Sequence, residues 1–465
     1  MARLKHVVIV VPGIGGSVLR GPDGRVVWGG GLSSTARSLA WPKRLDLAAP
    51  LEPVGLLPSI SVVGPLAVPG YDRLLCLIKN AFDHVRVDVA APGAPRDPRA
   101  DVVLFPYDFR RGVKAAAERL AVEVRDRLGP SGDAARRVIV VGHSLGGLVA
   151  RYWLGPMGGA AYCRALITVG TPHRGAPKAL AWLMNGVKVG ALPFRRATAT
   201  LRDWPAAFDL LPFYPVVRGP DGTTSFPNEL EWADAAWAKR ADEARRMHEE
   251  IEASWDGFAD LPPRAVPEVG AIFARGHTTF GRAELSPTGL TFAKADAEWM
   301  PNAGWLGDGT VPACSAIPLD LDERRTAWQA VGERHLPMAS TSAIVESLRN
   351  FSGDSLRPTR GDAPERPWLG LDLDETVTAG QPFLVSAKLL GAEPTDDTVV
   401  EARIKEPGGG PAAKIRCVFA DGTWSATVPP RPAGVYEVSV TAALGSGTGQ
   451  IRVSDVVGVV EGEHE

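Results

Sequence analysis

The sequence has few cysteines and no long apolar run, and both absences limit the kind of protein it can encode. Only four cysteines occur among 465 residues, and no two of them form a CxxC pair. A disulfide framework or a zinc site is therefore not expected, and the thiols are predicted to be reduced. No stretch approaches the roughly 18 apolar residues of a membrane-spanning helix, which excludes a transmembrane protein. The cysteines are Cys76, Cys163, Cys314 and Cys417.

An excess of charge of one sign is also lacking, since 51 basic and 53 acidic residues give a net charge of −2. This balance provides no electrostatic basis for binding nucleic acid or for a polybasic membrane anchor. The N-terminal apolar run, Val7–Val11, is shorter than the core of a signal peptide, and Pro12-Gly13 follows without a small-residue cleavage site. Together with reduced cysteines, these features predict a cytoplasmic protein and leave peripheral contact with a membrane open.

Four apolar runs, the first of them β-branched throughout, each end at a proline or a glycine, which is typical of strands buried on both faces of a parallel sheet. Helical patterns lie between them, such as the one from Lys114 to Leu128. Strands that alternate with helices predict a doubly wound, mostly parallel α/β sheet within residues 1–358. The runs are Val7–Val11, Val102–Phe105, Val138–Val141 and Ala165–Val169.

The alternation is interrupted between about residues 175 and 298, where we expect a helical cap insertion. This segment contains five tryptophans and a long helical pattern from Glu229 to Phe258. Two interpretations of the tryptophans stay open. An ordinary helical insertion packs them inside itself, whereas a cap over a binding site turns some of them toward an apolar ligand. They are Trp182, Trp204, Trp232, Trp237 and Trp255.

Beyond residue 358 the composition changes again. The polar stretch 359–367 is rich in proline, glycine and charge and predicts a linker. Short alternating runs with turn signals predict an immunoglobulin-like, all-β sandwich over residues 368–455. Residues 456–465 are predicted to form an acidic tail, of which 461–465 are expected to be disordered. The clearest runs are Phe383–Leu389, Val399–Ile404, Lys414–Phe419, Thr423–Val428 and Val435–Val440.

The strongest signal for chemistry is the sequence Gly-His-Ser-Leu-Gly at 142–146, which fits the G-x-S-x-G nucleophile elbow. A buried strand precedes it and a helical run follows, as the sharp turn of an elbow requires. Such a turn exposes the serine hydroxyl at the carboxyl end of a sheet, beside a helix N-terminus that stabilises negative charge. We therefore predict Ser144 as a catalytic nucleophile. The competing interpretation is a structural glycine turn with an idle serine.

A serine nucleophile needs a base, and in folds with this elbow the chain order is serine, acid, histidine. His335 follows a strand-like run and precedes a helical one, and it is the predicted base. His277 also follows a strand-like run and is a weaker candidate. His173 lies too close to Ser144 in the chain, and His248 lies in a charged helix, where a solvated face is expected.

The acid should lie between the serine and the base. The chain between Asp308 and His335 is long enough for one strand with its connections. Gly307 and Gly309 flank Asp308. These glycines suit a tight turn that aims the carboxylate inward, although a Gly-Asp-Gly-Thr segment on its own reads as a surface turn. We predict Asp308 as the acid and keep Asp320 or Asp322 as the fallback.

An oxyanion hole would complete such a site. One donor is expected from the backbone N–H of Leu145, and the other from the glycine-rich loop Pro12–Ser17 after the first strand. Ile14 and Gly15 lie in this loop, whose glycines leave the backbone amides accessible. A phosphate-binding loop is the alternative, but no nucleotide-binding pattern is present. No His or Cys pair has the spacing of metal ligands, so neither a metal nor a cofactor is expected.

Several segments together resemble the lecithin:cholesterol acyltransferase family, which includes lysosomal phospholipase A2 and phospholipid:diacylglycerol acyltransferases. The Tyr-Asp-aromatic-Arg and Gly-Asp-Gly-Thr-Val segments, in this order, are the most specific, and the resemblance covers about residues 5–350. The segments are Val10–Leu19, Pro106–Arg110, Gly142–Gly147, Thr168–Pro172, Leu210–Pro215, Gly307–Val311 and Arg334–Leu336.

The resemblance implies an α/β-hydrolase fold with Ser144 as nucleophile, Asp308 as acid, His335 as base, and Gly15 and Leu145 as oxyanion donors. It also implies acyl transfer from lipid or other apolar acyl esters, through an acyl-enzyme, to water or to an acceptor alcohol. An O-acyltransferase, an esterase and a phospholipase all fit this chemistry. The second hypothesis is a catalytically idle scaffold whose β-sandwich binds a protein or glycan partner, and the complete set of serine, acid and histidine disfavours it.

Overall fold

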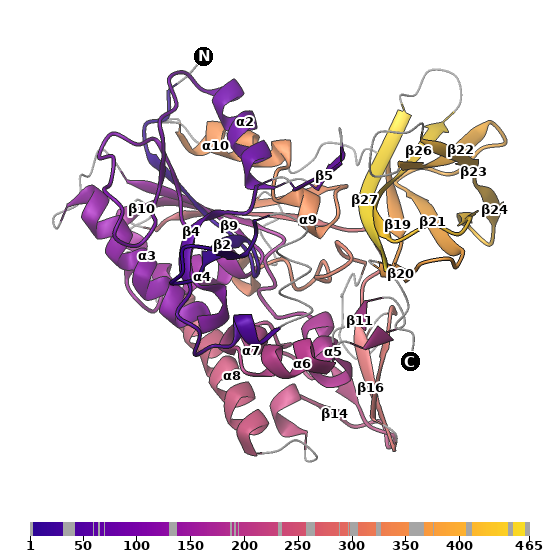
Figure 1. Cartoon of the computed structure of the whole chain (residues 1–465), viewed down its shortest axis with the longest axis horizontal. Helices are drawn as coiled ribbons and strands as arrows, with labels where there is room; N and C mark the ends of the chain where they lie inside the picture. Colours follow the sequence, from indigo (N-terminus) through magenta and orange to yellow (C-terminus); the bar gives the residue numbers. More distant parts are fainter. Residues whose placement is uncertain are drawn as a thin grey trace.

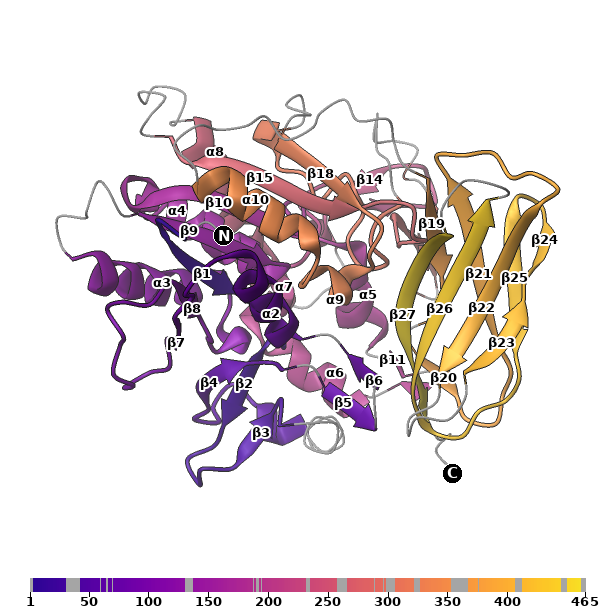
Figure 2. The ribbon, with the colours of Figure 1, turned by 90° about the horizontal axis from the view of Figure 1, so that it is seen from above.

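The computed structural model contains an α/β part and a C-terminal all-β part that lie side by side (Figures 1 and 2). All elements given below lie within the residues that the structure describes. These are 3–30, 42–58, 60–63, 66–68, 70–129, 137–186, 188–189, 192–193, 195–230, 235–256, 266–287, 289–295, 297, 306–321, 327–352, 367–374, 376–405, 412–444 and 450–460.

A seven-stranded sheet forms the centre of the α/β part, in the order β18-β15-β10-β9-β1-β8-β7. Every pair of neighbours among these described strands is parallel, so the predicted parallel α/β sheet is confirmed. The strands are β1 Val7–Val11, β7 Val87–Val89, β8 Val102–Leu104, β9 Val138–His143, β10 Cys163–Val169, β15 Glu268–Ala274 and β18 Trp328–Val331.

Helices cover both faces of this sheet because its strands are apolar on both sides. Alternate residues of β1 belong to two separate hydrophobic clusters. One cluster includes side chains of α2 (Tyr71–Ala81) and α10 (Ser342–Ser352). The other includes side chains of α3 (Val113–Leu128) and α4 (Leu145–Leu154). Each aliphatic side chain buried in this way contributes about 1.5–3 kcal/mol, and the result is the doubly wound arrangement that the sequence predicts.

The segment predicted as one helical cap, 175–298, is interrupted, and that boundary is wrong. It contains four helices, but it also contains β15, which lies between β10 and β18 in the central sheet. The apolar sequence EVGAIFA of β15 is typical of a strand. It follows a long helix, however, and therefore lies inside the segment predicted as the insertion. The helices are α5 Pro177–Asn185, α6 Arg195–Arg202, α7 Pro205–Phe208 and α8 Ala235–Asp256.

The tryptophans of this segment serve mainly to pack the helices. Trp204, Trp237 and Trp255 are buried in the same hydrophobic cluster as α3 and α4. Trp182 is half-buried, with the ammonium group of Lys178 over its ring. Trp232 lies outside the described residues. For the three buried tryptophans, ordinary packing is therefore the correct interpretation.

Short elements surround the central sheet. Two small sheets and two hairpins lie in its loops, together with several 3-10 helices. The sheets are formed by β2 Ser17–Arg20, β3 Val26–Trp28 and β4 Glu52–Leu56, and by β13 Val217–Arg218, β14 Thr224–Ser225, β16 Arg282–Ser286 and β17 Gly289–Ala293. The hairpins are β5 Ile60–Val63 with β6 Leu66–Val68, and β11 Lys188–Val189 with β12 Leu192–Pro193. The 3-10 helices are η1 Pro42–Leu45, η2 Phe109–Arg111, η3 Gly159–Tyr162, η4 Pro227–Glu229 and η6 Leu319–Leu321, and α9 His335–Met338 is a single-turn α-helix.

The C-terminal part consists of a four-stranded sheet, β19-β21-β25-β24, and a five-stranded sheet, β20-β27-β26-β22-β23. Their inner faces share one hydrophobic cluster, and the predicted β-sandwich is confirmed. The strands are β19 Trp368–Asp372, β20 Thr376–Thr378, β21 Phe383–Leu390, β22 Thr398–Lys405, β23 Ala413–Arg416, β24 Val418–Ala420, β25 Thr423–Val428, β26 Gly434–Leu444 and β27 Gln450–Val460.

Two predicted boundaries in this part are wrong. The run Lys414–Phe419, predicted as one strand, is divided at Cys417, so that β23 joins one sheet and β24 the other. The predicted tail 456–465 begins inside β27, which reaches Val460 because its last residues are apolar and pair with β20 and β26. Residues 461–465 and linker residues 359–366 lie outside the described residues.

The four cysteines are all described, and none of them forms a disulfide bond. Among the described residues, no helix is long and apolar enough to cross a bilayer.

Candidate active site

Ser144 lies at the turn between β9 and α4, at the carboxyl end of a central strand. Its φ of 52° is in the left-handed region that residues other than glycine rarely adopt. Glycines make the turn sterically feasible. A Cβ on Gly142 would collide with the backbone of Gly147, and one on Gly146 would collide with the carbonyl groups at the end of β1. This is the strained strand-to-helix turn of a nucleophile elbow.

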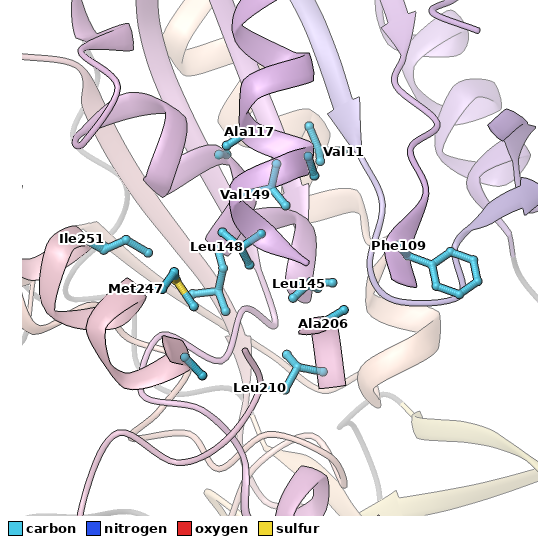
Figure 3. Packing of buried hydrophobic residues seen from close by; sticks show 14 of the residues in the cluster. Val11, Phe109, Ala117, Leu145, Leu148, Val149, Ala206, Leu210, Met247 and Ile251 are labelled. Carbon is cyan, nitrogen blue, oxygen red and sulfur yellow. The ribbon is translucent and has the colours of Figure 1, made fainter. Parts of the chain in front are cut away.

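The helix that follows the elbow is anchored by its buried face. Figure 3 shows Leu145, Leu148 and Val149 of α4 within the hydrophobic cluster of the α/β part. Residues of α3, α7 and α8 lie around them, and this packing fixes the N-terminus of α4 relative to the sheet. The surrounding residues labelled in the view include Ala117, Ala206, Met247 and Ile251.

Ser144, His335 and Asp308 come from distant parts of the chain and form one continuous chain of hydrogen bonds. The Oγ of Ser144 lies 3.0 Å from Nε2 of His335. The Nδ1 of His335 lies 2.7 Å from Oδ2 of Asp308. All three residues are buried. Because an ionised carboxylate can only accept, the proton sits on Nδ1, and Nε2 is free to accept the proton of the serine hydroxyl.

Asp308 stays ionised although it is buried. Burial raises the pKa of a carboxylic acid, but the electrostatic interaction with His335 and hydrogen bonds from His335, Val311 and Thr310 outweigh it and lower the pKa of Asp308 below its usual value. The N–H groups of Val311 and Thr310 donate to Oδ1 at 2.7 and 2.8 Å. The two carboxylate oxygens therefore have separate tasks, since Oδ1 fixes the turn and Oδ2 orients the imidazole.

The acid and the base are joined through their backbones as well. The N–H of His335 donates to the carbonyl oxygen of Asp308 at 3.1 Å. The residue before the acid, Gly307, exchanges two backbone hydrogen bonds of 3.0 Å with His277, just after β15. The strand β18 lies between Asp308 and His335 in the chain, as the predicted strand unit between acid and base requires.

The predicted oxyanion loop lies beside the serine. A Cβ added to Gly13 would be 2.9 Å from Cβ of Ser144, and Gly15 in the same loop has a φ of 73°. Ile14 is half-buried between them. On the other side, Leu145 is the first residue of α4, where a helix leaves the backbone N–H unused. Gly13 of this loop and Leu145 are therefore close to the nucleophile, and the role of Ile14, Gly15 and Leu145 as oxyanion donors stays a prediction.

The Tyr-Asp-aromatic-Arg motif acquires a function that the sequence did not reveal. The hydroxyl of Tyr107 donates to the carbonyl oxygen of Pro12 at 2.8 Å, and its backbone N–H donates to Oγ of Ser17 at 3.0 Å. Tyr107 therefore holds both ends of the oxyanion loop. The motif is itself rigid, because Asp108 and the buried Arg110 form an ion pair at 2.8 Å.

Tyr71 of α2 is a site residue that no motif indicated. Its oxygen accepts the N–H of Gly13 at 3.0 Å and lies 2.9 Å from Nδ1 of His143. The Nε2 of His143 lies 3.1 Å from the backbone oxygen of His335. Burial lowers the pKa of His143 to about 3, so the ring is neutral. The oxyanion loop, the elbow and the base are thereby connected by buried hydrogen bonds.

The other histidines considered as bases have different partners. His277 bonds the backbone of Gly332 through Nε2 and that of Leu371 through Nδ1. His173 is buried beside Arg151. The expectation of a solvated face for His248 is wrong, because α8 turns it inward to the backbone oxygen of Asp209 at 2.9 Å.

The fallback acids cannot be compared with Asp308, since the side chain of Asp320 and all of Asp322 lie outside the described residues. A search of the described residues for three or more His, Cys, Asp and Glu side chains arranged to hold a metal ion found none.

The chain is similar to one known protein family. Residues 96–258, which include the elbow, match the family model named Lecithin:cholesterol acyltransferase. The predicted resemblance to this family is confirmed.

Solved structures with similarity to the chain include the Bacillus licheniformis lipase BlEst2. Its propeptide form has 12% identity and a TM-score of 0.38, with 97% of this chain and 93% of that chain covered. Its mature form has 12% identity and a TM-score of 0.34, with 75% and 92% covered. A superoxide reductase (neelaredoxin) from Ignicoccus hospitalis has 17% identity and a TM-score of 0.16, with 20% and 80% covered. The comparison with curated proteins found no match.

Proposed function

We propose that this chain is a serine-dependent acyl-transfer enzyme that acts on lipid or other apolar acyl esters. The observation that carries the proposal is the hydrogen-bond chain from Ser144 through His335 to Asp308, at an elbow with left-handed φ. The family match over residues 96–258 supports a lipid acyl ester as substrate.

The first step forms the acyl-enzyme. Oγ of Ser144 attacks the carbonyl carbon of the ester while Nε2 of His335 accepts the hydroxyl proton. Asp308 stabilises the imidazolium that results. The backbone N–H groups of Leu145 and of the loop with Ile14 and Gly15 stabilise the negative charge on the carbonyl oxygen. The bond to the leaving alcohol then breaks, and that alcohol takes the proton from His335.

The second step regenerates the serine. Water or an acceptor alcohol attacks the acyl carbon and gives its proton to His335, and Ser144 leaves with that proton. An acid is released when water attacks, and a new ester when an alcohol does. The chain therefore acts as a hydrolase, that is an esterase or a phospholipase according to the ester it binds, when water reaches the acyl carbon, and as an O-acyltransferase when an alcohol does.

Exposed apolar side chains beside the site fit an apolar substrate. Leu336 follows the base directly and is 60% exposed, and Leu306, two residues before the acid, is 39% exposed. Contact with acyl chains, including those at a membrane surface, would cover both leucines.

The test is covalent labelling of the full-length chain with a fluorophosphonate probe, followed by mass spectrometry. We expect one label, on Ser144, and no label in Ser144→Ala. Turnover of p-nitrophenyl butyrate by Ser144→Ala should fall by about 10⁶, as for loss of the nucleophile in a comparable triad. Ser386→Ala, in strand β21 of the sandwich, is the matched control and should behave as the wild type. An unlabelled wild-type protein would refute the proposal and favour the idle scaffold.

The acceptor is identified by product analysis. Wild-type enzyme is given a long-chain acyl ester, with and without a long-chain alcohol, and the released acid and the new ester are quantified. A new ester that forms only with intact Ser144 identifies a transferase, and free acid alone identifies a hydrolase.

A further inference from the structure

The β-sandwich contacts the two segments that carry the acid and the base. In both views of the molecule, β19 and β27 lie beside α9, the single-turn helix that begins at His335 (Figures 1 and 2). We propose that the C-terminal β-sandwich is a positioning part of the catalytic site and that it acts on His335 mainly through Arg334. This inference rests on the proposed function, because it takes Asp308 and His335 as acid and base.

Arg334 directly precedes the base, and the sandwich binds its side chain. Its guanidinium group is buried. Nε lies 2.7 Å from Oδ2 of Asp455 in β27. Nη1 lies 3.5 Å from the carbonyl oxygen of Leu371 in β19 and 3.4 Å from that of Leu373 just after it. The side-chain contacts of Arg334 with Asp455, Leu371 and Leu373 therefore join the base to both sheets of the sandwich.

The same guanidinium group covers the turn that carries the acid. Gly309 follows Asp308 directly and has a φ of 90°. A Cβ on Gly309 would collide with the guanidinium group of Arg334. Arg334 is thus clamped between the acid turn on one side and Asp455 on the other, and displacement of its side chain would disturb the acid and the base together.

His277 provides a second connection between the sandwich and these segments. Its Nδ1 accepts the N–H of Leu371 at 2.9 Å, and its Nε2 donates to the carbonyl oxygen of Gly332 at 3.0 Å. Its backbone pairs with Gly307, the residue before the acid. The ring of His277 therefore connects strand β19 to the loop that leads to the base, and its backbone connects both to the acid turn.

The backbone of the β-sandwich approaches the backbone of the α/β part closely. A Cβ on Gly370 of β19 would collide with the carbonyl oxygen of Gly276, and one on Gly276 would collide with the ring of Trp368. The guanidinium of Arg275 lies over the same ring, 4.9 Å from its centroid. Such an approach requires glycine on both sides, and it leaves little freedom for the sandwich to shift without moving the segment after β15.

Charge gives Asp455 a second effect on the reaction. The imidazole of His335 becomes positive in the transition state, and the guanidinium group of the adjacent residue opposes that charge. The carboxylate of Asp455 neutralises the guanidinium at 2.7 Å, in surroundings where both side chains are largely buried. Loss of that carboxylate would loosen Arg334 and would also leave its charge uncompensated beside the base.

The test uses Asp455→Asn in the full-length chain, with Glu437→Gln and Lys294→Ala as matched controls. Glu437 is a carboxylate of the same sheet that pairs with Arg452 on the surface. Lys294 of the α/β part forms an exposed ion pair with Asp372 of the β-sandwich. For each folded variant, kcat and KM for p-nitrophenyl butyrate and the rate and final extent of fluorophosphonate labelling are measured.

We expect Asp455→Asn to lower kcat and the labelling rate together by about 10- to 100-fold, as for a small misplacement of a catalytic group, with KM changed by less than about threefold. The final extent of labelling should stay at one per chain, which separates slow chemistry from a loss of folded protein. Both controls should match the wild type. A folded Asp455→Asn variant with wild-type kcat and labelling rate overturns the proposal, whereas a wild-type protein that never labels overturns the proposed function instead.

Should Asp455→Asn fail to fold, the double variant Arg334→Met/Asp455→Leu replaces the buried ion pair with apolar side chains, an exchange that often preserves stability. We expect it to fold and to keep a reduced kcat with a normal final extent of labelling, because methionine makes no directional bond to β19 or β27. A folded double variant with wild-type kcat would show that the sandwich does not position the base through Arg334.

Discussion

The hydrogen bond between the hydroxyl of Tyr71 and Nδ1 of His143 can run in one direction only. The backbone oxygen of His335, 3.1 Å from Nε2 of His143, can only accept, so Nε2 carries the proton. The ring is neutral, and its Nδ1 must accept from Tyr71 at 2.9 Å. Tyr71 in turn accepts the N–H of Gly13. The oxyanion loop and the base are therefore linked by a chain in which every donor and acceptor is determined.

Tyr71→Phe removes the central oxygen of this chain. It leaves the N–H of Gly13 and Nδ1 of His143 without their partner in a buried site, which should cost about 1–3 kcal/mol of unfolding free energy. We also expect kcat to fall by about tenfold, because the oxyanion loop loses its link to the elbow. Urea unfolding and turnover of p-nitrophenyl butyrate measure the two effects. Tyr152→Phe, which loses an exposed hydrogen bond to Glu250, is the control, and equal behaviour of the two variants would contradict the assignment.

Asp308→Asn tests the acid. The amide would stabilise the wrong tautomer of His335, and turnover should fall by about 10⁴ while the fold is retained. Single-turnover kinetics with a p-nitrophenyl ester measure the loss, and circular dichroism checks the fold. Asp374→Asn changes an exposed carboxylate near Lys294 and should be neutral. Near-normal turnover in Asp308→Asn, together with inactivity of Asp320→Asn or Asp322→Asn, would move the acid to one of those residues.

Gly13→Ala tests the approach of the oxyanion loop to the nucleophile. The new Cβ would lie 2.9 Å from Cβ of Ser144, which is too close for two carbon atoms, so the loop or the serine must shift. We expect kcat to fall by about 100-fold, with a smaller effect on stability, because such misplacement acts on the reacting atoms. Gly55→Ala in β4 is the matched control, since its Cβ would meet no atom within 4 Å. A wild-type kcat in folded Gly13→Ala would contradict the predicted role of this loop.

The buried histidines should make the protein sensitive to acid. Burial and the charge of Arg334 lower the pKa of His277 to about 4, whereas an unfolded chain titrates histidine near pH 6.5. Between these values the unfolded state binds more protons, so the contribution of His277 is complete above about pH 6.5 and is lost as the pH falls toward 4. Its slope reaches about 1.4 kcal/mol of unfolding free energy per pH unit.

Comparison of the wild type with His277→Gln isolates this effect. Asp209, whose pKa burial raises to about 7, acts in the opposite direction and is present in both proteins, so it cancels in the difference. The stability advantage of the wild type should shrink as the pH is lowered from 6.5 to 4.5, as measured by urea unfolding. An advantage that stays constant over this range would show that His277 is not held neutral.

Features with a local signal were predictable from the sequence. The strand β1 is a run of five buried β-branched residues, and the elbow needs small residues at fixed offsets from Ser144, so both could be read from neighbouring residues. The spacing of Asp308 and His335 reflected one strand unit, and the two residues are indeed hydrogen-bonded. For β1 and the elbow the physical cause lies within a few residues of the chain, and for the acid and the base it lies in the length of one strand unit.

The missed features depend on contacts between distant segments. Tyr71 acts through Gly13 and His143, and Arg334 through Asp455, and in neither case does the local sequence differ from that of an ordinary helix or loop. The strand β27 extends into the predicted tail for a related reason. Its last residues are apolar but lead directly into the charged residues 461–465, and their pairing with β20 and β26 makes them part of the strand.

The central position of β1 also has a consequence for how the protein folds as it is synthesised. Val8 pairs with Val102 on one side, and Val7 pairs with Val138 on the other. Both neighbours of β1 follow it in the chain, so β1 leaves the ribosome before them and must wait for both, and closing such long loops is entropically costly and slow. Until β9 emerges, the apolar residues of β1 are unpaired and prone to aggregation. We expect the loop after β1 to acquire its shape only once the elbow has been made, so the site forms late in synthesis and as a unit.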